Sequence, residues 1–206
     1  MKSEVSILAD FKNTQTCANL MKAFAGESMA RNRYTISAEL ARKQNLHVID
    51  AVFNYTANQE KEHAEIFYQH LKELSGQELN VNADYPIDVT NDVIQLLRYA
   101  QQHEYAEHDK IYDSFAKIAR DEGFSSVAGS FEMIAGIEKT HAKRFEDLAN
   151  MLSNGTLFVS DVVCDWVCLN CGYVLNAKNA PDKCPVCSHD KGFFIRIELA
   201  PYTKAH

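Results

Sequence analysis

Helical periodicity extends from about residue 14 to residue 153, and it constrains the fold of this chain more than any other feature. In the first block, Leu20, Phe24, Ile36 and Leu40 recur at helical spacing. Four such blocks follow one another, and they span about 14–44, 46–74, 90–123 and 124–154. The second block stops at Ser75-Gly76, which is a typical C-terminal signal of a helix. The third starts near Thr90-Asn91-Asp92, a cluster of helix-capping residues.

The connections between these blocks differ in length. Only a few residues separate the first block from the second and the third from the fourth. By contrast, GQELNVNADYPIDVTN, residues 76–91, separates the second from the third and shows no clear period. Two short turns and one long crossover describe an all-α, ferritin-like four-helix bundle. We therefore predict this bundle for residues 1–155.

The pattern of residues changes after Gly155. TLFVSDVVCDWVC and GFFIRIEL are rich in β-branched and aromatic residues, and both predict short strands. Two Cys-x-x-Cys pairs accompany these stretches: Cys168 with Cys171, and Cys184 with Cys187. A piece this short could hardly support a core without a bound metal ion. We therefore predict a second domain over residues 160–206, which is small, β-rich and metal-binding.

The four thiolates do not by themselves identify the metal. Paired Cys-x-x-Cys motifs suit zinc, which would make the unit a structural ribbon for binding or oligomerisation. They suit iron equally well, which would make the unit a one-electron carrier. Four aromatic side chains are expected to form an apolar shell around the ion, namely Trp166, Tyr173, Phe193 and Phe194. Cys17 and Cys164 fall outside the pattern, and we expect them to be free or buried thiols.

Composition excludes some classes of function. The chain has 206 residues with 28 Asp and Glu against 21 Lys and Arg, so its formal net charge is −7. This balance disfavours a nucleic-acid-binding protein, which usually carries a basic face. We see no apolar run near the roughly 18 residues of a membrane span. The N-terminal stretch shows no signal-peptide pattern, and paired cysteines without a disulfide framework suit a reducing compartment. We therefore expect a cytoplasmic protein with no membrane or nucleic-acid partner.

Two Glu-x-x-His motifs lie within the predicted helices. The second block carries Glu60 and His63, and the fourth carries Glu138 and His141. Three residues are a little less than one helical turn, so each Glu and its His stand side by side on one face. A bundle with one such motif on each of two helices, and a Glu on each of the other two, can build a two-iron site.

The first and third blocks supply the remaining acids. Glu27 lies beside the small residues Ala25 and Gly26, and the third block carries Glu104 and Glu107. Taken alone, each would be an ordinary surface acid. Taken with the two Glu-x-x-His motifs, five carboxylates and two imidazoles are sufficient to hold two metal ions. Without metal, acids converging in an apolar core would repel one another and raise one another's pKa values.

With these motifs in view, the sequence resembles the rubrerythrin family over nearly its whole length. The stretches that carry the resemblance are AFAGESMARNRYTISA, NQEKEHAEIF, SFAKIARDEGF, EKTHAKRF and WVCLNCGYV…APDKCPVC. The resemblance implies seven di-iron ligands, namely Glu27, Glu60, His63, Glu104, Glu107, Glu138 and His141. It implies that Glu60 and Glu138 bridge the two irons, and that Tyr34 and Tyr112 hydrogen-bond the carboxylates.

The resemblance also implies a fold, an activity and partners. The C-terminal unit would be a rubredoxin-like domain in which Cys168, Cys171, Cys184 and Cys187 hold a single iron, with zinc possible on recombinant expression. On oxidation Glu107 would bind one iron, and on reduction His63 would replace it. The expected activity is that of a non-haem di-iron peroxidase that reduces hydrogen peroxide to water and is re-reduced through its own four-cysteine iron.

The expected partners are hydrogen peroxide and an electron-donor protein such as rubredoxin with its reductase. A homodimer is expected, in which the four-cysteine domain of one subunit lies near the iron pair of the other. The alternative function is that of a ferroxidase or iron-handling protein, the role of plain ferritin-like bundles. The zinc ribbon remains a third interpretation of the C-terminal unit.

Overall fold

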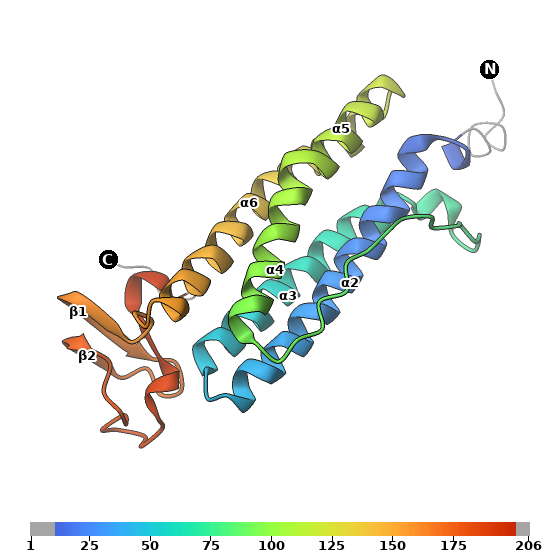
Figure 1. The fold of residues 1–206 in the computed structure, drawn as a ribbon. Helices are drawn as coiled ribbons and strands as arrows, with labels where there is room; N and C mark the ends of the chain where they lie inside the picture. Colours follow the sequence, from blue (N-terminus) through green and yellow to red (C-terminus); the bar gives the residue numbers. More distant parts are fainter. Residues whose placement is uncertain (1–10, 201–206) are drawn as a thin grey trace.

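The computed structural model describes residues 11–200, so residues 1–10 and 201–206 of the two predicted domains lie outside the described chain. Four long helical units form the bundle (Figure 1). Their bounds are α2 Gln15–Lys43, α3 His47–Gln69, α4 Val93–Ala106 continued through a π-helical turn by α5 Tyr112–Asp121, and α6 Ser125–Ser153. α2 packs along α3, while α4 and α5 pack along α6. In the described chain, no helix is long and apolar enough to cross a membrane.

Capping residues fix where the helices begin and end. The Thr14 side chain accepts a hydrogen bond from the Cys17 amide at the start of α2. Asp92 accepts from two amides at the start of α4, as the cluster at residues 90–92 predicts. Gly123 ends the third unit with φ +89° and Gly155 follows α6 with φ +69°. Both lie in the left-handed region that glycine adopts at little cost.

The third unit differs from the single helix that the sequence predicts. A π turn, Glu107–Ile111, interrupts it between α4 and α5. Tyr112 is buried at 1% exposure, whereas Ile111 is 39% exposed. The buried face of α5 is therefore shifted by one residue relative to that of α4. The predicted helical block is therefore present, but helical spacing alone did not reveal the π turn within it.

Two apolar clusters form the core of the bundle. One contains Phe53 and Phe145 and lies towards the α2–α3 turn. The other contains Phe67 and Phe131 and lies towards the opposite end. The crossover after residue 75 runs beside α2 (Figure 1), where the Tyr85 hydroxyl donates to the Lys22 carbonyl oxygen over 2.8 Å.

The C-terminal unit is a three-stranded antiparallel sheet with strand order β2-β1-β3. Its strands are β1 Val159–Cys168, β2 Val174–Asn179 and β3 Phe194–Arg196. Strand β2 was not predicted, and the predicted strand GFFIRIEL is a short β3 flanked by the 3-10 turns η3 Lys191–Phe193 and η4 Ile197–Leu199. A mostly helical, ferritin-like fold followed by a small sheet confirms the predicted fold class.

The sheet is attached to the end of the bundle beside the α2–α3 turn (Figure 1). Val48 of α3 is fully buried in one cluster with Val167 and Ile195 of the sheet. The ring of His47 stacks on Phe193 with 3.8 Å between centroids. Gly192 approaches the turn so closely that a Cβ there would lie 1.9 Å from the Asn45 carbonyl oxygen. Backbone contact therefore fixes the sheet against the bundle.

Candidate metal centres

A layer of acidic and histidine side chains lies between the two apolar clusters of the bundle. Every long helix contributes at the level where one cluster ends and the other begins. The buried members are Glu27 from α2, Glu60 and His63 from α3, Glu104 from α4, and Glu138 and His141 from α6. Each is at most 5% exposed. Buried charges need pairing or a metal ion, so this layer is the natural place for one.

These six side chains form two overlapping groups, and within each group the ligand atoms lie within 4.8 Å of one another. One group is Glu27, Glu60, His63 and Glu138, and the other is Glu60, Glu104, Glu138 and His141. Glu60 and Glu138 belong to both groups. This shared position is the one that the resemblance gives to bridging carboxylates.

The donor atoms fit a pair of metal ions. Glu138 places one oxygen 2.8 Å from His63 Nδ1 and the other 2.9 Å from His141 Nδ1. Among the described residues, both Glu138 oxygens, one oxygen each of Glu60 and Glu104, and His141 Nδ1 lack a hydrogen-bond partner of good geometry. Oxygen and imidazole nitrogen atoms that crowd together without bonding one another are the ligands that iron and similar cations take.

Burial and charge within this layer shift the pKa values of several of its groups. Burial, together with repulsion from Glu138 and Glu60, raises the pKa of the Glu27 carboxyl well above its ordinary value. The pKa of the Glu104 carboxyl is likewise raised by burial and by the same two neighbours. Burial lowers the pKa of His141, but the close carboxylates of Glu104, Glu138 and Glu60 outweigh it and raise that pKa to about 12. Without metal, the imidazoles would therefore carry the positive charge that the carboxylates require.

Glu107 is the one predicted ligand that the structure leaves outside both groups of the described chain. It begins the π turn and is only partly buried. Burial and the charges of Glu138 and Glu60 still raise the pKa of its carboxyl, so it lies within electrostatic reach of the layer. His63, in contrast, is inside the first group. The structure thus places His63 at the site and Glu107 beside it.

Two tyrosines reach the layer from opposite sides. Tyr34, part of the apolar cluster near Phe53, donates a hydrogen bond to Glu104. Tyr112, part of the cluster near Phe67, donates a hydrogen bond to Glu27. Burial and the neighbouring carboxylates raise the pKa of both phenols, which keeps them protonated and able to donate.

Sequence reasoning missed two further interactions around the layer. The Gln59 side-chain oxygen lies 3.1 Å from His141 Nε2, so it holds the ring with Nδ1 facing the carboxylates. Asp88 of the crossover joins Arg33, at 3.3 Å, to His103, at 3.1 Å. The only sequence signal for Gln59 is its place directly before Glu60. The Asp88 contacts depend on the path of the crossover, which hydrophobic periodicity does not predict.

The four predicted cysteines come together in the C-terminal unit. Cys168, Cys171, Cys184 and Cys187 form one group, with Sγ separations of 3.8 Å for Cys168–Cys187 and 3.6 Å for Cys171–Cys184. Trp166 and Phe194 are buried beside them, while Tyr173 and Phe193 pack around the cluster. Cys17 and Cys164 are not members of this group. Four thiols at these separations fit a tetrahedral metal site.

The family models cover both parts of the chain. The model described as rubrerythrin matches residues 18–149, and the model described as the rubredoxin-like domain of rubrerythrin matches residues 166–195. A rubrerythrin of Clostridium perfringens is 43% identical over 188 residues, which cover 91% of this chain and 96% of that protein.

The chain belongs to the rubrerythrin family.

Further relatives agree with this assignment. A rubrerythrin of Nitratidesulfovibrio vulgaris is 38% identical over 91% of this chain and 96% of its own length. A solved structure of nigerythrin in a mixed-valence state superposes with a TM-score of 0.59 at 27% identity, covering 89% of this chain and 90% of that one. The rubrerythrin chain described here thus carries a di-metal carboxylate site and a rubredoxin-like four-cysteine site.

Proposed function

We propose that this rubrerythrin is a peroxidase that reduces hydrogen peroxide to water at the carboxylate layer. The observation that carries the proposal is that one chain holds both a di-metal group and a separate four-cysteine group. When bound, an iron pair would polarise the two peroxide oxygens and supply the two electrons that their cleavage requires. Nigerythrin, a relative, is known in a fully reduced, all-ferrous state, which supports redox-active iron in the layer.

The chain's own side chains prepare this site. Tyr34 and Tyr112 hold Glu104 and Glu27 by hydrogen bonds, and Gln59 holds His141, so three of the ligands are oriented in advance. Glu107 and His63 are the pair that would exchange with the oxidation state. Glu107 begins the π turn, a helix irregularity that is frequent at functional sites.

We propose further that electrons pass from the four-cysteine iron of one subunit to the layer of another, in a homodimer. In the described chain, the sheet touches α3 at His47, and Glu60 lies thirteen positions further along that helix. That is about 20 Å of helix. A second copy would bring a four-cysteine group nearer to the layer. Thiols held for metal binding suit the cytoplasm, where a rubredoxin-like donor and its reductase would operate.

Stopped-flow mixing tests the peroxidase activity. Fully reduced, iron-loaded protein is mixed with hydrogen peroxide and, separately, with dioxygen. The expected result is much faster oxidation by peroxide. Faster turnover of dioxygen with excess ferrous iron would instead identify a ferroxidase and contradict the proposal. Metal analysis with a visible spectrum distinguishes iron from zinc at the four cysteines, since a ferric tetrathiolate is red and zinc is colourless.

Cysteine variants test the electron relay. Cys171→Ala should leave single-turnover oxidation of the chemically reduced layer intact, whereas steady turnover with a protein donor should collapse. Cys164→Ala is the matched control, because this thiol lies in the same unit but outside the metal group. Equal steady-state rates in Cys171→Ala and the parent protein would exclude the relay.

Mixed dimers test transfer between subunits. A Cys171→Ala chain lacks the relay, and a Glu138→Ala chain lacks a shared ligand of the layer. Neither homodimer should turn over with a protein donor, but a co-assembled mixture should recover part of the parent rate. Absence of recovery in a verified mixed dimer would show that transfer occurs within one chain.

A further inference from the structure

A second feature of the bundle bears on the substrate. A cavity of about 340 Å³ lies between α2, the crossover and the π turn, and we name it the crossover cavity. Gly26 of α2, Tyr85 and Pro86 of the crossover, and Phe115 of α5 form part of its wall. Tyr85 bounds it firmly, because its hydroxyl bonds the Lys22 carbonyl oxygen and its ring faces Gly26.

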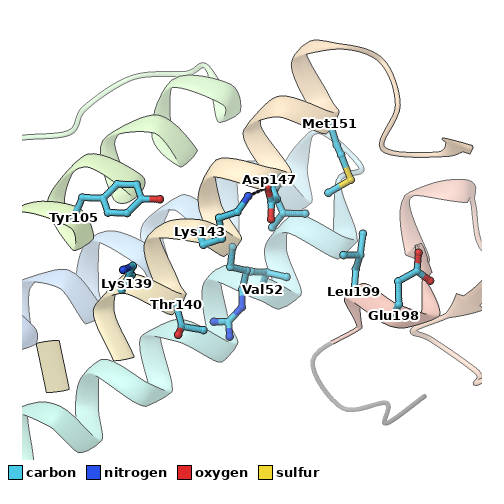
Figure 2. A pocket seen from close by; sticks show the side chains of 11 residues that line it. Val52, Tyr105, Lys139, Thr140, Lys143, Asp147, Met151, Glu198 and Leu199 are labelled. Atoms are coloured by element: carbon cyan, nitrogen blue, oxygen red, sulfur yellow. Dashed lines mark hydrogen bonds and ion pairs between the residues drawn. The ribbon is translucent and has the colours of Figure 1, made fainter. Parts of the chain in front are cut away.

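The crossover cavity reaches the carboxylate layer. Glu107 and Tyr112 both line it, and Tyr112 donates to the buried ligand candidate Glu27. A second cavity, of about 470 Å³, lies beside α6 and η4 (Figure 2). Its described lining includes Lys139 and Thr140 but none of the seven predicted ligands. The crossover cavity is therefore the better route from solvent to the site.

The crossover cavity is larger than hydrogen peroxide requires, and its walls offer apolar contacts that hydrogen peroxide cannot use. One water molecule occupies about 30 Å³ of liquid, and hydrogen peroxide is only somewhat larger. Six of the lining side chains are apolar and could contact an alkyl or aryl group, namely Ala23, Ala83, Pro86, Ala106, Ile111 and Phe115. Arg33, fixed by Asp88, adds a polar group to the wall. The wall also includes charged side chains such as Lys22, Asp84 and Lys110. Apolar surface beside placed polar groups is typical of a small-molecule site.

We propose that the crossover cavity binds organic hydroperoxides, so that they are substrates of the same site. This inference rests on the proposed peroxidase function. The hydroperoxide group lies towards Glu107, and the organic group lies against Phe115 and Ile111. The reaction is ROOH + 2 e⁻ + 2 H⁺ → ROH + H₂O: the O–O bond breaks, each oxygen gains a proton, and a reduced iron pair held by the carboxylate layer would supply both electrons.

Binding can be measured without turnover. Cumyl alcohol, the product of cumene hydroperoxide, is titrated into the zinc-loaded protein and followed by NMR. We expect saturable shifts at Ile111 and Phe115 that disappear in Ala106→Leu, which fills the cavity. Ala51→Leu is the matched control, since Ala51 is also partly buried on a helix but lies on α3, away from this cavity. Shifts confined to the cavity beside α6, or no saturable shifts, would overturn the proposal.

Kinetics separate this proposal from the peroxidase function itself. The iron-loaded protein should reduce both hydrogen peroxide and cumene hydroperoxide. Ala106→Leu should lower kcat/KM for cumene hydroperoxide about tenfold relative to hydrogen peroxide, as crowding of an apolar pocket does. Ala51→Leu should leave the ratio unchanged. Reduction of hydrogen peroxide alone would overturn the organic-substrate proposal only, whereas reduction of neither would overturn the peroxidase function.

Discussion

Metal affinity at the carboxylate layer should depend steeply on pH, because two imidazoles hold protons that metal ions must displace. Burial lowers the pKa of His63, but hydrogen bonds to Glu138 and Glu60 raise it to about 9. The pKa of His141 rises to about 12 by the same kind of contact. Near pH 7 both rings are therefore protonated in the metal-free protein. A metal-ligating imidazole is neutral, so loading the layer releases at least these two protons.

The sign and size of the effect follow from this count. Protons are bound in the metal-free protein and released on loading, so affinity rises as pH rises. Each proton contributes about 1.4 kcal/mol per pH unit, and two give about a hundredfold change in the binding constant for the pair per unit. The rise should become less steep above about pH 9, where His63 is already neutral. Any protonated carboxyl, such as that of Glu27, would make the slope steeper.

Competition against a chelator of known pH-dependent affinity measures the slope. The four cysteines are first filled with zinc, and Co²⁺ is then titrated into the layer between pH 6 and 8 and followed by its visible spectrum. His63→Ala should weaken binding and reduce the slope by about one proton. A slope near zero in the parent protein would refute the assignment of charged imidazoles to this layer.

Three further predictions concern single side chains. Glu138→Ala should abolish binding of both ions while the four-cysteine site still fills, because this carboxylate serves both groups; metal analysis checks it. Gly192→Ala should detach the sheet from the bundle, since its Cβ would strike the Asn45 oxygen. Limited proteolysis should cleave this variant more readily than the parent protein. The control is Gly136→Ala, whose Cβ would meet no other atom: it should stay as protease-resistant as the parent and stabilise α6 by about 1 kcal/mol. Tyr34→Phe should lower the stability of the metal-free protein by about 1–3 kcal/mol, measured by urea unfolding, because Glu104 loses its buried donor.

The sequence predicted the features that repeat or that need unusual residues. Helical spacing located four units to within a few residues, and capping residues such as Asp92 marked their ends. The Glu-x-x-His pairs pointed to inward-facing ligands because one pair lies mid-helix in each of two helices, as a di-iron bundle requires. The structure brings six of the seven predicted side chains together. Those ligand assignments stay predictions until a metal is bound.

The features that the sequence did not predict depend on contacts between distant segments. Strand β2 contains Asn176 and Asn179, which are poor strand formers, and it exists because β1 offers it a partner. The closeness of Gly192 to the α2–α3 turn cannot be read from either segment alone. The position of Glu107 follows from the π turn, whose local signal was a buried Tyr112 where regular spacing favours Ile111.

The π turn adds one residue to the third helical unit. Side chains about seven residues apart share a face of an α-helix, yet the next buried residue on the face of Glu104 is Tyr112, eight residues later. Deleting one residue, for example Asp109, would restore that spacing and join α4 to α5 without rotating either apolar face. A shortened chain should therefore keep both apolar clusters and fold, while Glu107 loses the local widening that surrounds it. A shortened chain that folds but binds metal more weakly in the layer would show that the extra residue serves the metal site and not the fold.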